Sequence, residues 1–419
     1  MKASQEKIDK IKQTLFQTRE RRKIQVCKIY KLKIDKSHLS SQQNKFLSKI
    51  FIEAKWFYNF ILNQEDIFNA SDCLKLKEIR ILKLDKLEKR TLEFLSSQMK
   101  QSLYERIKDA IKILSKLKQL KFKIGKLKFK SEINSIELKQ YNITWKFDKT
   151  RIKIQGCKLP FKVNGLKQIP KDCEFANAEL VRKPSGYYIH VTTFQTKEKR
   201  IKTNKEVGLD FGIKTSITTS DGEKFDIKIP ESKKLKRLQL FFSKKQKGSH
   251  NRWKILLKIK KEYERISNQK QDKVNKLVSY LKTNYDTIYI QDEMIKQWHK
   301  GLFGKQVQHS ALGAIKARLK NLESTQVISR LEPTTKLCPI CGQLNKISLS
   351  ERTYNCSCGY NKDRDIHSAC NILLIGKLKS NSVMEYNSTT SEKETSEISK
   401  RNLENLSYTS LKMEAPTFR

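Results

Sequence analysis

The chain has 419 residues and a net charge of +44, and charged residues make up 32% of it. Hydrophobic residues make up 37%, which is enough for several buried cores and predicts two to four modules. An excess of Lys and Arg on this scale would destabilise an isolated globular protein through self-repulsion, so we expect a bound polyanion, first of all a nucleic acid. No run approaches the roughly 18 apolar residues of a membrane-spanning helix, so we expect no membrane partner.

The first residues lack the apolar core of a secretory signal, so we expect the protein to stay in the cytoplasm, where thiols are reduced. Five of the nine cysteines are scattered, and the other four cluster between Cys338 and Cys358. We therefore expect the clustered cysteines to coordinate a metal rather than to form disulfides.

The first half of the chain predicts a β-barrel that is interrupted by helices. Residues 27–35 alternate apolar and polar side chains, as a strand does. From residue 41 to about 120 the apolar spacing is helical, and from about 121 to 195 it returns to a period of two. The economical interpretation is one barrel, built from the first strand and the later strands, with the helices as an excursion from it.

The second half predicts an RNase H-like fold, which makes the whole chain an α+β multidomain protein. Three strands joined by Gly and Asp-Gly turns begin at residue 207, and two long basic helices follow. The remaining expected elements are a strand at 286–293, a helix near 306–321, a strand at 324–331 and a helix from residue 364. Beyond residue 379 the composition shifts to Ser, Asn, Thr and Glu, which is typical of a disordered tail.

The clustered cysteines have the spacing C-x₂-C-x₁₄-C-x-C, formed by Cys338, Cys341, Cys356 and Cys358. Four thiolates on two adjacent turns match one tetrahedral Zn²⁺, and a glycine follows each pair, as a tight ligand turn requires. Because the protein would supply all four ligands, we expect this zinc to be structural.

Acidic side chains form a second constellation. In "VGLDFG" the apolar residues point one way along a strand and Asp210 the other, where an unpaired carboxylate is costly. In "TIYIQDE" the two isoleucines face the core, and Gln291 and Glu293 share the opposite face. Asp365 lies in the first turn of the last helix, where the helix dipole favours its ionised form. Three such acids can hold two divalent cations for phosphodiester hydrolysis, and Mg²⁺ suits an oxygen site. Taken singly, each acid could equally be a turn or cap residue.

Several stretches resemble the RuvC-like nuclease core of TnpB, a family of transposon-encoded RNA-guided DNA endonucleases related to compact type V CRISPR effectors. They are "GLDFGIKTSITTSDG", the basic segment with "KKQKGSHNRWK", "KLCPICG", "CSCGYNKDRD" and "NIL". The similarity is strongest from about residue 206 to 376, and "AKWFYNFILNQ", "KLPFKV" and "KMEAP" extend it over most of the chain.

The resemblance implies a domain organisation and catalytic residues. Asp210 and Asp365 would be the catalytic aspartates, holding Mg²⁺, and the protein would bind a guide RNA. The implied domains are a wedge-like β-barrel (1–40 and 121–203), a helical recognition lobe (41–120), a RuvC-like nuclease domain (204–335 and 360–378), an inserted zinc ribbon (336–359) and a disordered tail (379–419).

The chain departs from the family pattern at two positions. Where the family has a Glu at the end of the middle strand, alignment places Gln291. Glu293 lies two residues further, on the same strand face, and we favour it as the third catalytic and magnesium-binding carboxylate, reached by a small shift or bulge. If that shift does not occur, the site has two acids, or another acid such as Asp292 completes it. His367 stands where the family has Asn, and it either orients the site or caps the helix.

We therefore expect an RNA-guided, Mg²⁺-dependent DNA endonuclease of TnpB type, which cleaves guide-matched double-stranded DNA next to a short target-adjacent motif. One or two chains would bind each guide RNA. Two alternatives stay open: a compact type V CRISPR effector, and a nuclease-inactive RNA-guided DNA-binding repressor, which Gln291 alone favours. Basic stretches at 114–130 and 233–254 mix Lys and Arg with Leu, Phe and Trp, a composition that suits a groove along a nucleic-acid backbone. For any single Lys the simpler interpretation is a solvated helix face.

Overall fold

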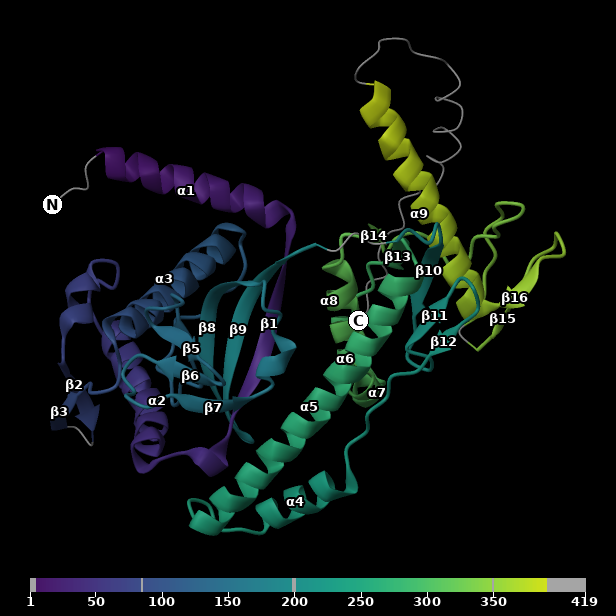
Figure 1. Cartoon of the computed structure of the whole chain (residues 1–419). Coiled ribbons are helices and arrows are strands. Elements are labelled where there is room, and N and C mark those ends of the chain that lie inside the picture. Colours follow the sequence, from purple (N-terminus) through teal and green to yellow (C-terminus); the bar gives the residue numbers. More distant parts are fainter. Residues whose placement is uncertain (1–4, 84–85, 198–200, 349, 390–419) are drawn as a thin grey trace. The chain divides into compact units, whose positions relative to one another are not determined.

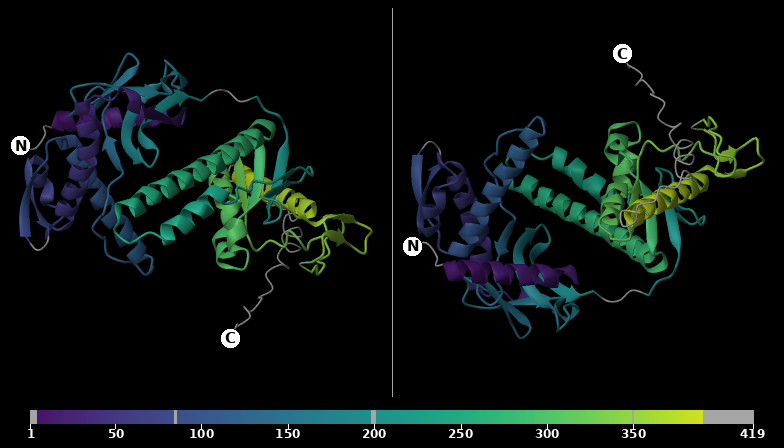
Figure 2. Two further views of the ribbon diagram at one scale, coloured as in Figure 1. Left: turned by 90° about the horizontal axis from the view of Figure 1, so that it is seen from below. Right: turned by 90° about the horizontal axis from the view of Figure 1, so that it is seen from above.

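A computed structural model describes residues 5–83, 86–197, 201–348 and 350–389 (Figure 1). The chain divides into two compact units, Met1–Arg200 and Ile201–Arg419. Figure 2 gives two further views of the same elements. The finer domain boundaries stay a prediction.

The first unit contains a nearly closed antiparallel barrel. Its sheet has the strand order β4-β8-β9-β1-β7-β6-β5. Because the edge strands β4 and β5 are consecutive in the chain and are joined by residues 139–144, the sheet curls almost into a ring. The strands are β1 (Gln25–Ile34), β4 (Ser135–Leu138), β5 (Trp145–Asp148), β6 (Arg151–Ile154), β7 (Phe161–Asn164), β8 (Glu174–Lys183) and β9 (Gly186–Thr196), and helix α1 (Gln5–Lys23) precedes them.

The insertion between β1 and β4 contains a hairpin as well as the helices that the sequence predicts. Helices α2 (Ser41–Leu62) and α3 (Ser97–Gln119) flank this hairpin, which is formed by β2 (Glu78–Lys83) and β3 (Lys86–Thr91). Ser40 begins α2 with a capping box, and Ser96 accepts a hydrogen bond from the backbone of α3. The buried faces of both helices share one continuous core with the barrel. The hairpin has short strands of mixed polarity, which is why a helical period dominates the sequence there.

The second unit is built on a mixed sheet with the strand order β12-β11-β10-β13-β14. Strand β11 is antiparallel to β10, whereas β13 and β14 run parallel to it, and the element order is the one that the RNase H-like prediction requires. The strands are β10 (Glu206–Phe211), β11 (Ile217–Thr219), β12 (Lys224–Phe225), β13 (Thr287–Gln291) and β14 (Thr325–Ile328). The helices are α4 (Lys233–Ser243), α5 (His250–Asn284), α6 (Ile295–Lys300), α7 (Gly304–His309), α8 (Leu312–Lys320) and α9 (Arg364–Thr389). A two-stranded ribbon of β15 (Thr353–Asn355) and β16 (Asn361–Asp363) precedes α9.

Two helix boundaries differ from the prediction. The single helix expected near 306–321 is divided into α7 and α8 at Ala311, whose backbone has a positive φ of 49°. Helix α9 continues through Thr389, so the disordered tail predicted from residue 379 begins inside a helix. Residues 390–419 of that tail lie outside the described residues.

Helices cover both faces of the mixed sheet. Residues of α5 and α8 pack with Val207, Leu209 and the isoleucines of β13 on one face, and α9 packs on the other. Helix α9 lies directly against the strands because Gly208 and Gly376 leave room for it. A Cβ on Gly208 would lie 2.1 Å from the Ala369 carbonyl oxygen, and a Cβ on Gly376 would lie 2.1 Å from the Tyr289 ring. The strand alternation thereby directs Asp210 towards α9.

Candidate active site and metal centre

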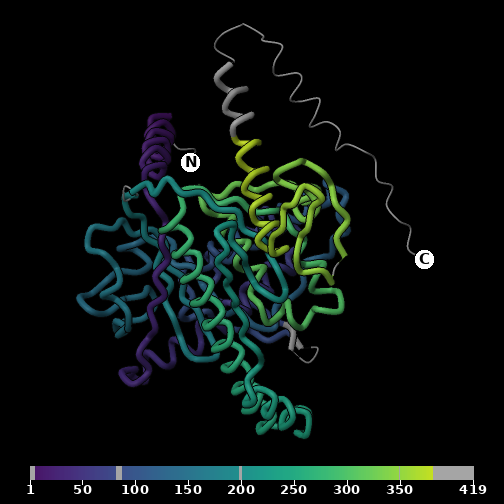
Figure 3. Tube along the Cα trace, turned by 90° about the vertical axis from the view of Figure 1, so that its right-hand side faces the viewer, coloured from purple at the N-terminus to yellow at the C-terminus, as the bar shows by residue number. Residues whose placement is uncertain are grey.

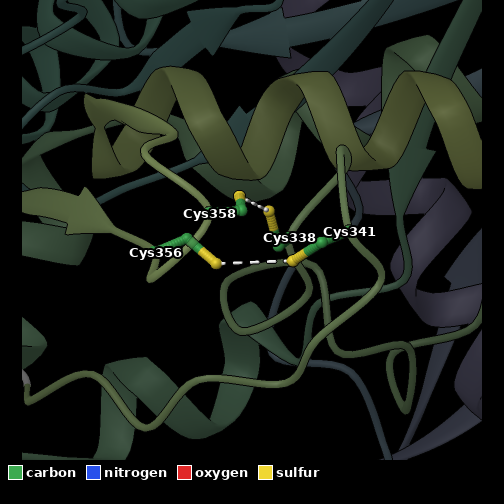
Figure 4. A group of neighbouring side chains, drawn as sticks. All are labelled: Cys338, Cys341, Cys356 and Cys358. Carbon is green, nitrogen blue, oxygen red and sulfur yellow. Dashed lines mark hydrogen bonds between the residues drawn. The ribbon is translucent and has the colours of Figure 1, made fainter.

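Cys338, Cys341, Cys356 and Cys358 converge in one cluster (Figure 4). Their sulfur atoms all lie within 4.8 Å of one another. The Cys338 and Cys358 sulfurs are 3.6 Å apart, and those of Cys341 and Cys356 are 3.5 Å apart. Four sulfurs placed tetrahedrally about 2.3 Å from a central ion would be about 3.8 Å apart, so the cluster could hold a zinc ion.

Each cysteine pair is shaped by a tight turn. The Gly342 amide donates to the Cys338 carbonyl, the Gly359 amide donates to the Cys356 carbonyl, and both distances are 3.0 Å. Both glycines have positive φ, 74° and 88°, as expected for turns that bring two ligands to one side. A hydrogen bond from the Cys358 backbone amide lowers the pKa of Cys356 to about 6, and so favours the thiolate that a metal requires.

The cysteine segment is attached to α9 through aromatic stacking. Tyr354 of β15 and His367 of α9 are both fully buried, and the Tyr360 hydroxyl lies 3.5 Å from His367 Nδ1. Burial lowers the pKa of His367 to about 4, so the ring is neutral near pH 7. His367 therefore packs against the cysteine segment. Figure 3 shows the yellow-green loops of this segment gathered beside α9.

Asp210 is a partly buried carboxylate near two other acids. Ser368 Oγ of α9 donates to Asp210 Oδ1 at 3.0 Å. Burial and, to a smaller extent, the negative charges of Asp365 and Glu293 raise the pKa of Asp210 to about 7, although the Ser368 hydrogen bond opposes them. The two other predicted acids thus act on Asp210 electrostatically, and a cation among the three would relieve the repulsion.

Asp363, rather than Asp365, caps helix α9. Asp363 Oδ1 accepts hydrogen bonds from the amides of Asp365 and Ile366, at 3.0 and 3.2 Å, and Lys224 pairs with its other oxygen at 2.9 Å. These contacts satisfy the first turn of the helix. The cap interpretation of Asp365 is therefore unnecessary, and its carboxylate is available at the helix N-terminus.

The prediction that Gln291 and Glu293 share one face of a strand is wrong. Strand β13 ends at Gln291, and the Glu293 amide turns back to donate to the Gln291 carbonyl at 2.9 Å. Glu293 lies in the turn that follows the strand, yet its charge still acts on Asp210. Asp292 pairs at 2.7 Å with both Lys316 and Lys320, and their hydrogen bonds lower its pKa to about 2. Asp292 is thus already neutralised.

The cysteine cluster and the three carboxylates differ in how close their ligand atoms lie to one another. In the part of the chain that the structure describes, the four cysteines are the group whose ligand atoms lie within 4.8 Å of one another, and the three carboxylates do not form such a group. The carboxylates could still bind a hard divalent cation together, because Asp210 is partly buried and the charges of Asp365 and Glu293 act on it.

The sequence motifs missed two polar residues, namely Ser368, which contacts Asp210, and Thr334, which contacts Ser368. Ser368 could have been predicted from the sequence, because it lies three residues after Asp365 and therefore on the same helix face. Thr334 could not have been predicted from the sequence, because it lies in an irregular segment between β14 and Cys338.

Helices α4 and α5 form a basic hairpin within the second unit (Figure 1). Arg252 donates to the carbonyls of Phe242 and Lys245, both at 2.8 Å, and its guanidinium lies 3.8 Å from the centre of the Phe242 ring. Phe241 and Trp253 are more than half exposed among the lysines. Exposed aromatics and lysines on one hairpin suit contact with a nucleic acid.

No helix in the described residues is both long enough and apolar enough to cross a membrane.

Comparisons with known proteins agree with these features. Residues 189–297 match the family model OrfB_IS605, described as "Probable transposase", and residues 314–372 match the model of the Cas12f1-like TNB domain. A "Putative RNA-guided DNA endonuclease" of Streptomyces pristinaespiralis is 28% identical over 228 residues, which are 52% of this chain and 57% of that protein. "Putative RNA-guided DNA endonuclease InsQ" of Escherichia coli K12 is 29% identical over 195 residues, 41% of this chain and 48% of that protein.

The chain thus spans about half the length of these two relatives. The cryo-EM structure of a Cas12f1-sgRNA-target DNA complex has a TM-score of 0.48 and 13% identity to this chain, and the match covers 83% of this chain and 98% of that one. The two family models and the two relatives support the assignment of the chain to the TnpB family.

Proposed function

We propose that the chain is an RNA-guided, Mg²⁺-dependent DNA endonuclease of TnpB type. The observation that carries the proposal is that Asp210 points from the mixed sheet towards α9, where the charges of Asp365 and Glu293 act on it. The relatives, which are named as RNA-guided DNA endonucleases, support the same activity.

Divalent cations bound by these acids would activate water and stabilise the leaving oxygen of a phosphodiester. The chain's own contribution is positioning. Strand β10 presents Asp210, the first turn of α9 presents Asp365, and the turn after β13 presents Glu293. Ser368 donates to Asp210 and so favours its charged form.

The four cysteines would hold one structural zinc, with all four positions filled by protein. The ribbon they form would then position the start of α9, and with it Asp365. The nucleic-acid partners would be a guide RNA and double-stranded target DNA, with one or two chains per guide. The net charge and the α4–α5 hairpin support such partners.

A second candidate is a guided DNA-binding repressor without cleavage, which Gln291 favours because an amide replaces the expected carboxylate. One experiment separates the two functions. RNA that copurifies with the protein is sequenced, and DNA matching its guide is incubated with the complex and Mg²⁺. Cleavage supports the nuclease, whereas binding without cleavage across Mg²⁺ and Mn²⁺ titrations supports the repressor. A repeat array or a transposon end beside the gene would distinguish a CRISPR effector from a transposon protein.

A further inference from the structure

The side-chain amide of Gln291 is fixed by three hydrogen bonds. Its Nε2 donates to the carbonyl oxygens of Ser329 and Glu332, at 3.1 and 3.0 Å, so both amide protons are used. Its Oε1 faces the opposite way and accepts from Thr334 Oγ1 at 2.9 Å. The two carbonyls therefore determine which way the amide points.

The hydroxyl groups beyond Gln291 lead to Asp210. Thr334 has one hydroxyl proton and donates it to Gln291, so its oxygen can only accept from Ser368 Oγ, which lies 3.4 Å away. Ser368 also has one hydroxyl proton, which lies nearest to Asp210 Oδ1, at 3.0 Å, so the contact with Thr334 is the weaker branch of a shared hydrogen bond. Thr334 and Ser368 are at most 4% exposed. This chain of hydrogen bonds engages Oδ1 of Asp210 and leaves Oδ2 outside it.

Thr334 is also held from the helix side. Asn371 of α9 donates through Nδ2 to the carbonyls of Thr334 and Leu337, both at 2.7 Å. Thr334 therefore lies between the end of β13 and α9, four residues before Cys338. Displacing it would disturb the strand, the helix and the start of the cysteine segment together.

We propose that Gln291, Thr334 and Ser368 are positioning residues, which hold the Asp210 carboxylate so that Oδ2 faces a divalent cation. On this proposal, Gln291 is not a former metal ligand that has lost its charge, but a residue with a role of its own. A Glu at this position would have no protons for the Ser329 and Glu332 carbonyls, and its charge would face two carbonyl oxygens. The proposal rests on the nuclease function proposed above.

The test compares Thr334→Val, which keeps the shape and loses the hydroxyl, with Thr334→Ser, which keeps the hydroxyl. Thr325→Val is the matched control, because the buried Thr325 hydroxyl of the same sheet has no hydrogen-bond partner among the described residues. Mn²⁺ binding to the full-length zinc-loaded protein is measured by EPR, with Asp210→Ala as the blank, and the Mg²⁺ concentration for half-maximal cleavage is measured in parallel. We expect Thr334→Val to weaken Mn²⁺ binding about tenfold or more, as loss of a partner that orients a metal ligand does. Thr334→Ser should restore most of the affinity, and Thr325→Val should match wild type.

Two results would overturn the proposal. The first is a Thr334→Val protein that is less stable to heat but unchanged in its Mn²⁺ and Mg²⁺ dependence, because the hydroxyl would then be merely structural. The second comes from Gln291→Glu, which also serves if Thr334→Val does not fold. We expect Gln291→Glu to weaken Mn²⁺ binding, whereas tighter binding or faster cleavage would make position 291 a ligand position. If the wild type cuts no DNA but the Mn²⁺ results are as expected, the nuclease function fails and the positioning role stands.

Discussion

The imidazole ring of His367 stacks on the phenol ring of Tyr354, with ring centroids 3.7 Å apart and an angle of 19° between the planes. Tyr354 belongs to the segment between the two cysteine pairs, and His367 lies two residues after Asp365 in α9. Folding of the cysteine segment and the position of the first turn of α9 are therefore linked through this contact.

Loss of a cysteine ligand should release the metal. We expect about one Zn²⁺ per chain, lost in Cys338→Ser and in Cys356→Ser with local unfolding of the ribbon, because a structural zinc site contributes folding free energy. Elemental analysis measures the zinc, and hydrogen exchange follows the ribbon amides. Cys27→Ser, an exposed position in β1, is the control and should retain zinc. Well-folded wild type without zinc would contradict the expectation.

The aromatic ring of Tyr354 should contribute more to the stability of the second unit than its hydroxyl does. Tyr354→Ala removes a fully buried ring and should lower the free energy of unfolding of the second unit by about 3–5 kcal/mol. Tyr354→Phe keeps the stack and removes the hydroxyl's hydrogen bonds with Asn345 and the Lys336 carbonyl, which should cost about 1–2 kcal/mol. Denaturant unfolding, monitored by hydrogen exchange of the α9 amides, measures the stability loss of both variants. Equal losses of stability in the two variants would argue against the role of the stack.

Asp210 should destabilise the metal-free fold at neutral and alkaline pH. Burial raises its pKa from 3.8 to about 7, so between about pH 4 and pH 7 the folded state holds a proton that the unfolded state has lost, and stability falls as the pH rises through this window. The loss would reach at most about 4 kcal/mol above pH 7. In Mg²⁺-free buffer at pH 8, Asp210→Asn should therefore melt at a higher temperature than wild type, and the difference should vanish near pH 4.

The exposed ion-paired Asp272 of α5 provides the control for that experiment. Asp272→Asn should give a nearly constant small difference from wild type across the same pH range. An Asp210→Asn protein that melts below wild type at pH 8 would show that the carboxylate is stabilised in a way that its surroundings do not explain.

Substitutions of single acids should show that Asp210, Asp365 and Glu293 are needed for cleavage and that Asp292 is not. If the proposed Mg²⁺ site is right, Asp210→Ala and Asp365→Ala should each abolish Mg²⁺-dependent cleavage of guide-matched DNA and leave RNA binding intact, because each would remove a metal ligand and no nucleic-acid contact. Glu293→Gln should also abolish cleavage. Asp292→Asn should cut within a few-fold of wild type, because Lys316 and Lys320 already neutralise that carboxylate. Normal cutting by Glu293→Gln would remove Glu293 from the site.

Guide RNA binding should weaken steeply with salt, because a protein of charge +44 displaces counterions from the RNA. Replacing Lys244, Lys245 and Lys247, at the tip of the α4–α5 hairpin, by Ala should make the logarithmic salt dependence shallower, by roughly 0.7–0.9 for each phosphate that these lysines neutralise. Filter binding between about 50 mM and about 500 mM salt measures the slope. An affinity that does not change with salt would contradict an electrostatic role for the excess charge.

The cysteine cluster and the orientation of Asp210 could be predicted from the sequence because both depend on local geometry. Two short turns bring Cys338 to Cys341 and Cys356 to Cys358, and the conformation of each turn follows from the glycine after it. Likewise, the alternation of a strand places Asp210 opposite its apolar neighbours wherever the strand lies in the fold. The position of Asp365 in the first turn of a helix was predictable for the same reason.

Where strand β13 ends, and what surrounds Gln291, was decided only by the tertiary structure. Periodicity continued the strand through Glu293, but the backbone turns after Gln291, whose amide binds carbonyls about forty residues further along the chain. The hydrogen-bond donor to Asp210 is still further away in the chain, because Ser368 lies 158 residues on and reaches Asp210 only after α9 has packed on Gly208. A period of two or of 3.6 residues determines which face of an element a side chain occupies. The residue at which the element stops and the partner it meets depend on hydrogen bonds between segments far apart in the chain, and these bonds form only when the segments pack together.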